Sequence, residues 1–260
     1  MRIALFADIH GNSIALDAVL ADIRAQGGVD ETWVLGDLAA IGHDPLGVLE
    51  RLERLPKTRF VRGNTDRYIV TGELPRPSLA EVEQDATLLP KLIQVARSFA
   101  WTQGAVSSNG WLDWLAQLPV EQRLTLPDGT RMLGVHASAG KDDGRGAYPG
   151  IGEAELGALM EGCDADLVFV AHTHWTLDRT VNDTRVINLG SVSNSFQPDL
   201  RASYAILEAD KGGYTVTPRR VDYDRDAVIK ALRKSRHPAA EFIVRYMLGQ
   251  NKPHWIQHTH

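Results

Sequence analysis

The sequence predicts an α/β protein, and two observations on the spacing of apolar residues support this. Over residues 1–63, short apolar runs typical of buried strands alternate with segments whose apolar residues recur at helical spacing. A β-α-β-α-β order of this kind implies parallel strands with helices on the faces of the sheet. Short apolar strands resume after residue 130, so both ends of the chain are expected to contribute to sheet structure.

The first three strands are predicted at residues 2–7, 32–36 and 58–63. A helix over 13–26 separates the first two, with Asn12 or Ser13 as its N-cap and Gly27–Gly28 as its end. A second helix is predicted from Pro45 through Leu55, with Asp44 as its N-cap, because proline is favoured at the first helical position.

Residues 72–120 are predicted to form a helical, cap-like insertion, since 78–118 contain no convincing strand. The tetrad Ser78-Leu79-Ala80-Glu81 has the form of a capping box, and the apolar spacing that follows indicates two helices. The segment is rich in aromatic residues. A packed helical hairpin and a cap that faces the substrate are both compatible with this composition.

The second half of the chain returns to strands. They are predicted at 131–135, 166–171, 185–190, 203–208 and 214–218. A short helix is expected at 153–161, and two helices at about 225–248 are expected to close the fold. The chain has no repeats and no low-complexity linker, so a single domain over residues 1–260 is predicted. His254, His258 and His260 fall in a polar tail that is predicted to be disordered.

Composition excludes several classes of function. A net charge of −5 gives no basic footprint for nucleic acid or for an anionic membrane. The single cysteine, Cys163, excludes an internal disulfide framework and a thiolate-rich zinc site. No run approaches the ~18 apolar residues of a membrane span. The N-terminus enters a strand and has no secretory-leader pattern, so a cytoplasmic protein is expected.

Polar residues that can bind metals follow five of the predicted strands. They are Asp8, His10, Asp37, Asn64, His136, His172 and His174. Ligands of parallel sheets gather at the carboxyl ends of the strands, so these side chains are expected to converge. The set is too large for one tetrahedral ion, and mixed imidazole and carboxylate ligands favour Mn, Fe, Zn, Co or Ni over Ca or Mg. Two such ions ~3.5–4 Å apart can clamp a phosphoryl group and generate a bridging hydroxide.

Five short motifs occur in order at these strand ends: "DIH" (8–10), "GD" (36–37), "GNTD" (63–66), "VHAS" (135–138) and "AHTH" (171–174). Together they resemble the motifs of the calcineurin-like metallophosphoesterase superfamily. With "NLGSV" (188–192), the resemblance extends from residue 3 to about residue 208. The "DIHGN" start, followed by the segment Gly36–Pro45, is most similar to the bacterial and archaeal phosphodiesterase-type branch.

The resemblance implies a four-layer αββα sandwich of two mixed β-sheets flanked by helices. It also implies that Asp8, His10 and His174 hold one metal ion, with Asp37 bridging to a second. The second ion would be held by three further residues, which are Asn64, His136 and His172.

Two positions depart from the family pattern. Thr65 stands where many members carry a histidine thought to protonate the leaving group, and Ala171 replaces a glycine. A threonine hydroxyl has no suitable pKa for general acid catalysis, so diesters or activated esters are expected to be better substrates than monoesters. The residues that could compensate are Asp66, Arg62, Arg67 and His43.

The predicted activity is therefore hydrolysis of phosphodiester or activated phosphoester bonds by a dinuclear, metal-dependent enzyme that uses a metal-bridging hydroxide. Asn64, Asp66 and His136 are the predicted catalytic residues. The predicted substrate contacts are Asn12, His43, Arg62 and Arg67. The alternatives are a dinucleoside polyphosphate or phosphoprotein phosphatase and a non-catalytic scaffold; the complete ligand set disfavours the scaffold. The expected partner is a small phosphoester substrate, and the sequence is compatible with a homo-oligomer.

Overall fold

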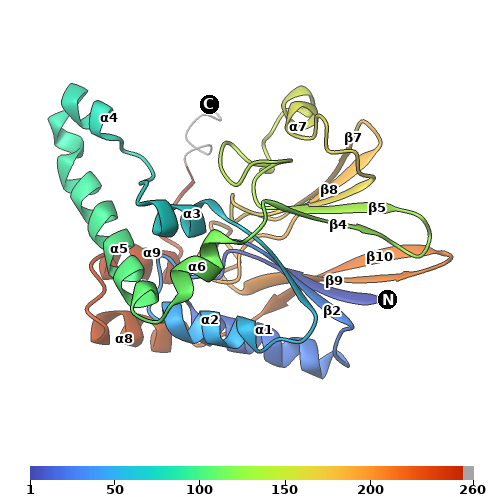
Figure 1. Ribbon diagram of the computed structural model, residues 1–260, viewed down its shortest axis with the longest axis horizontal. Coiled ribbons are helices and arrows are strands. Elements are labelled where there is room, and N and C mark those ends of the chain that lie inside the picture. Colours follow the sequence, from blue (N-terminus) through green and yellow to red (C-terminus); the bar gives the residue numbers. More distant parts are fainter. Residues whose placement is uncertain (254–260) are drawn as a thin grey trace.

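Two five-stranded mixed sheets lie face to face in the computed structural model, which describes residues 1–253 (Figure 1). The first sheet has the order β10-β9-β1-β2-β3 and the second has the order β4-β5-β6-β8-β7. Helices flank the pair of sheets, with α1 and α2 on the first sheet and α7 beside the second. The predicted αββα sandwich is thereby confirmed.

The first sheet combines three parallel strands with an antiparallel pair. In it, β1 pairs in parallel with β2, and β2 with β3, while β9 runs antiparallel to both β1 and β10. Its strands are β1 (Arg2–Phe6), β2 (Glu31–Leu35), β3 (Thr58–Val61), β9 (Ala202–Asp210) and β10 (Gly213–Val221). The carboxyl ends of β1, β2 and β3 therefore meet at one edge of the sheet.

The second sheet repeats this plan with different connections. Its central strands β5, β6 and β8 are parallel, and the outer strands β4 and β7 are antiparallel to their neighbours. Its strands are β4 (Glu121–Thr125), β5 (Arg131–Val135), β6 (Leu167–Val170), β7 (Leu177–Val181) and β8 (Thr184–Asn188). The loops after β5 and β6 thus leave the sheet on one side.

The two sheets are in close contact where β5 faces β2. A Cβ atom at Gly134 would lie 2.9 Å from Cε3 of Trp33, so no larger side chain fits there without a shift. Trp33 is fully buried, and it belongs to an apolar layer between the sheets that includes Ile3, Leu5 and Phe169. This layer fixes the sheets face to face and brings their loop ends together.

The helices of the two halves of the chain have these bounds: α1 (Ser13–Ala25), α2 (Pro45–Glu53), α3 (Asn64–Thr71), α7 (Glu153–Leu159), α8 (Arg225–Lys234) and α9 (Ala240–Met247). Asn12 caps α1 by accepting from Ala15 N, and Asp44 caps α2 with Pro45 in its first turn. Both caps are as the sequence predicts.

The predicted insertion consists of helices. They are α4 (Leu79–Gln84), the 3₁₀ turn η1 (Ala86–Leu88), α5 (Leu89–Ser107) and α6 (Trp111–Ala116). Of these, α5 and α6 pack against other helices, α5 on α2 and α3 and α6 on α3. Ser78 and Glu81 form the expected capping box. Phe99 and Leu115 are buried in the same apolar cluster as α1 and α2, which supports the packed-hairpin interpretation for this part.

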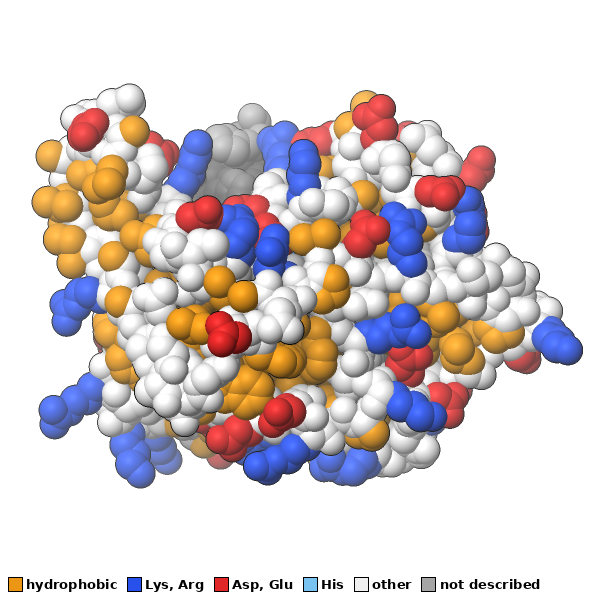
Figure 2. Space-filling view, viewed as in Figure 1, with side chains coloured by type: hydrophobic (Ala, Val, Ile, Leu, Met, Phe, Trp, Pro, Cys, Tyr) orange, Lys and Arg blue, Asp and Glu red, His pale blue; other side chains and the backbone are white. Residues whose placement is uncertain are grey.

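The far end of the insertion is an exposed arm made of α4 and the start of α5. Figure 2 shows hydrophobic side chains gathered over this arm. Leu79, Leu89 and Ile93 are 72%, 45% and 48% exposed. Exposed apolar groups of this kind are typical of contact surfaces, so the homo-oligomer stays a prediction.

Across the described residues, the helices are all too short or too polar to cross a membrane. The predicted disorder of the C-terminal tail concerns His254, His258 and His260, which lie outside the described residues.

Candidate metal centre

Five strand ends from both sheets deliver polar side chains to one place between them. Asp8 and His10 follow β1, Asp37 follows β2, and Asn64 begins α3 directly after β3. His136 follows β5, while His172 and His174 follow β6. Glycine makes this convergence possible, because a Cβ atom at Gly36 would lie 2.4 Å from Gly63 N and one at Gly63 would lie 2.2 Å from Asp37 Oδ1.

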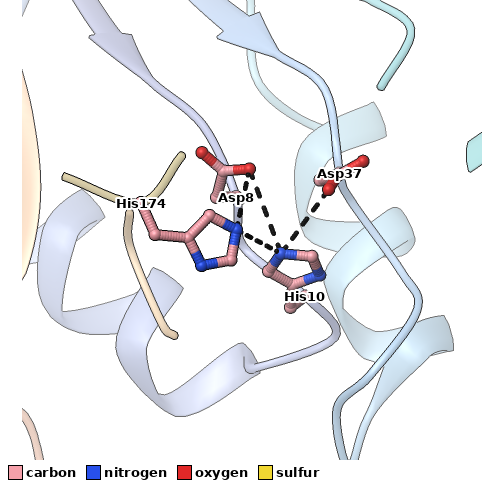
Figure 3. A group of neighbouring side chains, drawn as sticks. All are labelled: Asp8, His10, Asp37 and His174. Carbon is pink, nitrogen blue, oxygen red and sulfur yellow. Dashed lines mark hydrogen bonds and ion pairs between the residues drawn. The ribbon is translucent and has the colours of Figure 1, made fainter. Parts of the chain in front are cut away.

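The first group comprises Asp8, His10, Asp37 and His174 (Figure 3). Their potential ligand atoms all lie within 4.8 Å of one another. The Nε2 atoms of His10 and His174 face each other at 3.0 Å, and His174 Nε2 is 3.3 Å from Asp8 Oδ1. Two imidazole nitrogens and two carboxylates directed at one point form a suitable donor set for a divalent ion.

The second group is centred on Asn64. Its Oδ1 atom is 3.1 Å from His136 Nε2 and 3.0 Å from His172 Nδ1. Asp37 connects the two groups, because its Oδ2 is 3.6 Å from His10 Nε2 and its Oδ1 is 3.5 Å from His136 Nε2. Asp37 thus lies between the two groups, and the two histidines of "AHTH" lie in different groups; the division of the ligands between two ions stays a prediction.

Each of the four histidines has a backbone carbonyl at its outward ring nitrogen. His10 Nδ1 lies 3.1 Å from Ala40 O, and His136 Nδ1 lies 2.6 Å from Leu35 O. The other two are His174 Nδ1 with Asn194 O at 2.6 Å and His172 Nε2 with Gly144 O at 2.9 Å. A carbonyl at the outer nitrogen holds the proton there and leaves the inner lone pair free for a metal ion.

A buried carboxylate oxygen gives a further test of fit. Asp8 Oδ1 has no hydrogen-bond partner, although Asp8 is fully buried. A buried polar atom of this kind is unfavourable unless a ligand satisfies it. The residues of the first group therefore fit a divalent ion.

Backbone strain is concentrated in the ligand loops. Asp8, His10, Asp37, His172 and His174 have φ angles of 55°, 49°, 57°, 69° and 55°. Left-handed conformations are unusual for residues other than glycine and cluster at functional sites. The ligand loops are thus not extended at these residues, and left-handed turns direct His172 and His174, which are two residues apart, into the site.

The crowding of buried charged and polar groups shifts the pKa values of several predicted ligands. Burial lowers the pKa of His10 to about 4, against the opposing effect of Asp37, so this ring is neutral and can bind a metal ion. Burial also lowers the pKa of His136, but the Asp37 carboxylate outweighs it and the net pKa rises to about 10. Asp37 in turn has a lowered pKa because the neighbouring His136 outweighs the effect of burial.

The residues next to the ligands have structural contacts. Both carboxylate oxygens of Asp66 accept backbone N–H groups, from Asp37 and Gly63 on Oδ2 and from Leu38 on Oδ1, each at 2.9 Å. Thr65 donates its hydroxyl and its N–H to Asp37 Oδ1 at 2.8 and 2.9 Å. These contacts orient the "GD" and "GNTD" loops on one another, and the catalytic role of Asp66 stays a prediction.

The four predicted substrate contacts are dispersed around the site. The Asn12 side chain caps α1 and donates to Ser193 Oγ at 2.9 Å, which favours its structural interpretation. Arg62 and Arg67 both donate to Asp142. His43 is partly buried beside Asp44, and its Nδ1 atom has no hydrogen-bond partner. None of the described hydrogen bonds or ion pairs joins His43 to the ligand residues.

Several residues that position the ligands were missed from the sequence. Asn188 donates to Ala147 O, Ala171 O and Thr173 Oγ1, and so ties the loops before and after β6 together. Asp142 lies in the loop after β5, close to the Gly144 carbonyl that contacts His172. The motif "NLGSV" contains Asn188, but nothing in the pattern around Asp142 distinguishes it from an ordinary loop acid.

Comparison with known proteins decides the family. The calcineurin-like phosphoesterase superfamily domain matches residues 1–212. The chain belongs to this superfamily. A metallophosphoesterase from Sphaerobacter thermophilus shares 27% identity with a TM-score of 0.71, over 96% of this chain and 99% of that one. The similarity of this chain to the phosphodiesterase-type branch of the superfamily rests on its motifs alone and stays a resemblance.

Two further relatives bear on the fold and on the substrate. The hypothetical protein PH1004 from Pyrococcus horikoshii has the same fold, with a TM-score of 0.78 at 19% identity, over 96% of this chain and 99% of that one. The symmetrical bis(5'-nucleosyl)-tetraphosphatase of Pectobacterium atrosepticum is 37% identical over 71 residues, which are 27% of this chain and 25% of that protein.

Proposed function

We propose that this member of the superfamily hydrolyses phosphodiester or activated phosphoester bonds with two divalent ions, one in each group of ligands. The observation that carries the proposal is the position of Asp37, whose two oxygens face His10 and His136 separately. Ions bound there would neutralise charge on the phosphoryl oxygens and lower the pKa of the attacking water.

The chain's own residues would position the ions and the substrate. The outer carbonyls hold each imidazole in the tautomer that leaves its inner nitrogen free, and Asn64 contributes a neutral oxygen to the second group. Thr65 donates two hydrogen bonds to Asp37 Oδ1, which keeps this shared carboxylate in one orientation. Preorganised ligands lower the cost of reorganisation during the reaction.

The contacts of Thr65 and Asp66, two of the groups considered as general acids, support the choice of substrate. The Thr65 hydroxyl is donated to Asp37, and the Asp66 oxygens accept three backbone N–H groups. Neither group is placed to protonate a leaving group. Substrates with good leaving groups, or diesters, are therefore expected to react faster than simple alkyl monoesters.

The test combines metal analysis with substrate comparison. Protein purified without chelator is expected to hold two equivalents of metal, with Mn, Fe, Ni, Co and Zn compared by reconstitution. The ratio of kcat/KM for diphenyl phosphate to that for phenyl phosphate should exceed one. A clear preference for phenyl phosphate would contradict the proposed substrate class, and fewer than two equivalents of metal would contradict the dinuclear centre.

A second candidate is a dinucleoside polyphosphate hydrolase. It is favoured by the local similarity to a symmetrical bis(5'-nucleosyl)-tetraphosphatase. Diadenosine tetraphosphate belongs in the same substrate screen, and a kcat/KM for it well above that for diphenyl phosphate would select this candidate. Phosphoproteins are a third class of substrate, and a phosphoserine peptide tests them in the same assay. A fully metal-loaded protein with no hydrolysis of any of these compounds would favour the scaffold.

A further inference from the structure

The arm formed by α4 and the start of α5 has little packing within its own chain. All six residues of α4 stay at least partly exposed, and the main contacts of this helix are with η1 and α5. A helix shorter than about 12 residues is only marginally stable in water unless it packs against another element. The exposed apolar side chains of Leu79, Leu89 and Ile93 therefore indicate a contact surface.

The open surface continues along α5. Ile93, Ala100 and Gly104 are exposed, and their spacing puts them on one face of this helix, with Arg97 between them. A Cβ atom added at Gly104 would point into open space within the part of the chain that the structure describes. A helix face of small and apolar side chains allows a second helix to approach closely.

α5 connects the arm to the corner between α8 and α9. Near the middle of α5, the Trp101 ring packs edge-on against His237, which lies between α8 and α9, with ring centroids 4.7 Å apart. The helical rise places Leu89 roughly 18 Å from Trp101 along α5. In Figure 1 the arm and α8 lie at the same end of the long axis of the molecule. A twofold axis that crosses α5 between Leu89 and Trp101 would bring the arm of each copy to α8 and α9 of the other.

The arm and the α8–α9 surface carry opposite charges. Residues 78–90 contain three acids and no lysine or arginine, whereas residues 225–247 contain six basic and two acidic residues in a chain of net charge −5. The six basic residues are all exposed, and they are Arg225, Lys230, Arg233, Lys234, Arg236 and Arg245. Over residues 1–253, no ion pair joins Glu83, Lys230 or Lys234 to another side chain. These charges are therefore available to a partner, and opposite potentials favour contact between the two surfaces.

We propose that the arm docks on α8 and α9 of a second copy of this chain, in a dimer with twofold symmetry. Leu79, Leu89 and Ile93 are withdrawn from water in this dimer, and the acidic side of the arm faces the basic residues of the other copy. A second copy is preferred to a different protein, because the chain itself carries the complementary surface. The proposal is independent of the proposed phosphoesterase activity, since all seven predicted metal ligands lie outside the arm, α8 and α9.

The oligomeric state of the full-length protein is the first test. Light scattering after gel filtration and sedimentation velocity should give twice the mass of one chain at high concentration, with dissociation on dilution. Ile93→Glu should raise the dissociation constant by about tenfold or more, because it places a charge in the apolar part of the interface. Its melting temperature as a monomer should match that of the dilute wild-type protein, since Ile93 is 48% exposed.

Charge reversal tests which surface the arm meets. Glu83→Lys and Lys234→Glu should each raise the dissociation constant by about threefold or more, and the double variant should dimerise more tightly than either single variant. Glu161→Lys is the matched control, because it makes the same change of charge at an exposed residue just after α7, away from the arm. Its dissociation constant should stay within about twofold of the wild-type value.

Cross-linking of a mixture of isotope-labelled and unlabelled protein locates the contact directly. An amine-reactive cross-linker should join Lys91 at the start of α5 in one copy to Lys230 or Lys234 in the other. A monomer at every concentration would overturn the proposal and leave a different protein as the partner of the arm. A dimer that is insensitive to Ile93→Glu, a double charge reversal without recovery, or links between copies confined to other lysines would each overturn it by placing the interface elsewhere.

Discussion

Replacing Asp142 with asparagine should weaken one half of the metal centre without touching a predicted ligand. The Asp142 side chain is only 7% exposed, and it accepts from Arg62 Nε at 2.8 Å and from Arg67 Nε at 3.1 Å. Breaking a fully buried ion pair by removing one partner costs about 3–5 kcal/mol. The two arginines are 27% and 21% exposed, and Arg67 keeps its contacts with Glu73 and Asp143, so we expect a loss of about 1–3 kcal/mol.

The effect on the metal follows from the loop that Asp142 anchors. Two residues further on, the Gly144 carbonyl lies 2.9 Å from His172 Nε2. The same loop packs against His172 and Thr173, since a Cβ atom at Gly146 would lie 2.7 Å from Thr173 Cγ2 and 3.1 Å from His172 Cδ2. Loss of an outer-shell partner of a metal-binding histidine typically weakens metal affinity by about 10–100-fold. The ion held by Asn64, His136 and His172 is the one expected to be affected.

The assay is calorimetric titration of the apoprotein with Mn²⁺, together with urea unfolding. Asp142→Asn should retain one tight site and show a second site weakened by about 10–100-fold. The control is Asp17→Asn, which breaks an exposed pair with Arg51 and should change unfolding by at most about 1 kcal/mol and metal binding not at all. Wild-type affinity at both sites, with the expected destabilisation, would refute the role of the loop in positioning His172.

Three other changes test the site and the fold. Asp37→Ala removes the ligand shared by both groups, so elemental analysis should find both equivalents of metal lost; full occupancy would contradict the bridging position. Gly134→Ala forces a methyl group to 2.9 Å from the Trp33 ring, and urea unfolding should show about 1–3 kcal/mol of destabilisation, whereas no change would mean that the sheets can separate slightly. Burial lowers the pKa of His237 to about 4, whereas a histidine of the unfolded chain has a pKa of about 6.5. As the pH falls below about 6.5, the unfolded chain therefore binds a proton that the folded protein does not bind. The contribution of His237 to stability should therefore fall by about 2–3 kcal/mol between pH 6.5 and pH 4, and over this range the wild-type protein should lose about that much more stability than His237→Gln.

The sequence predicted the central strands well, because each is a short, apolar run bounded by polar or turn residues. The edge strands β4 and β7 were missed because neither of them is an apolar run. β7 alternates buried and exposed residues over Leu177–Val181, and its apolar content is low. A turn signal was available, since Asn182 and Asp183 both adopt positive φ angles of 48° and 63°, as a two-residue hairpin turn requires. The pair "ND" between two short β-like runs therefore indicated a hairpin.

The metal ligands could be predicted because their chemistry and their place at strand ends are both local properties. The residues that hold them could not, since their roles depend on contacts over long separations in the chain. Asp142 meets Arg62 across 80 residues, and the Ser191 hydroxyl meets the Asp8 carbonyl across 183.

The ligand loops combine two unfavourable features, and both have the same physical explanation. Five of the ligands adopt left-handed backbone angles, each of which costs roughly 1–2 kcal/mol for a residue with a side chain. The same loops bury Asp8 and Asp37 at 0% and 2% exposure and leave Asp8 Oδ1 without a hydrogen bond. Neither feature stabilises the fold by itself. Divalent ions would compensate both, because they pair the buried carboxylates and require donors directed inward at short range. The rigid sandwich behind the loops, with Trp33 packed on Gly134, provides the stability that permits such strained loops.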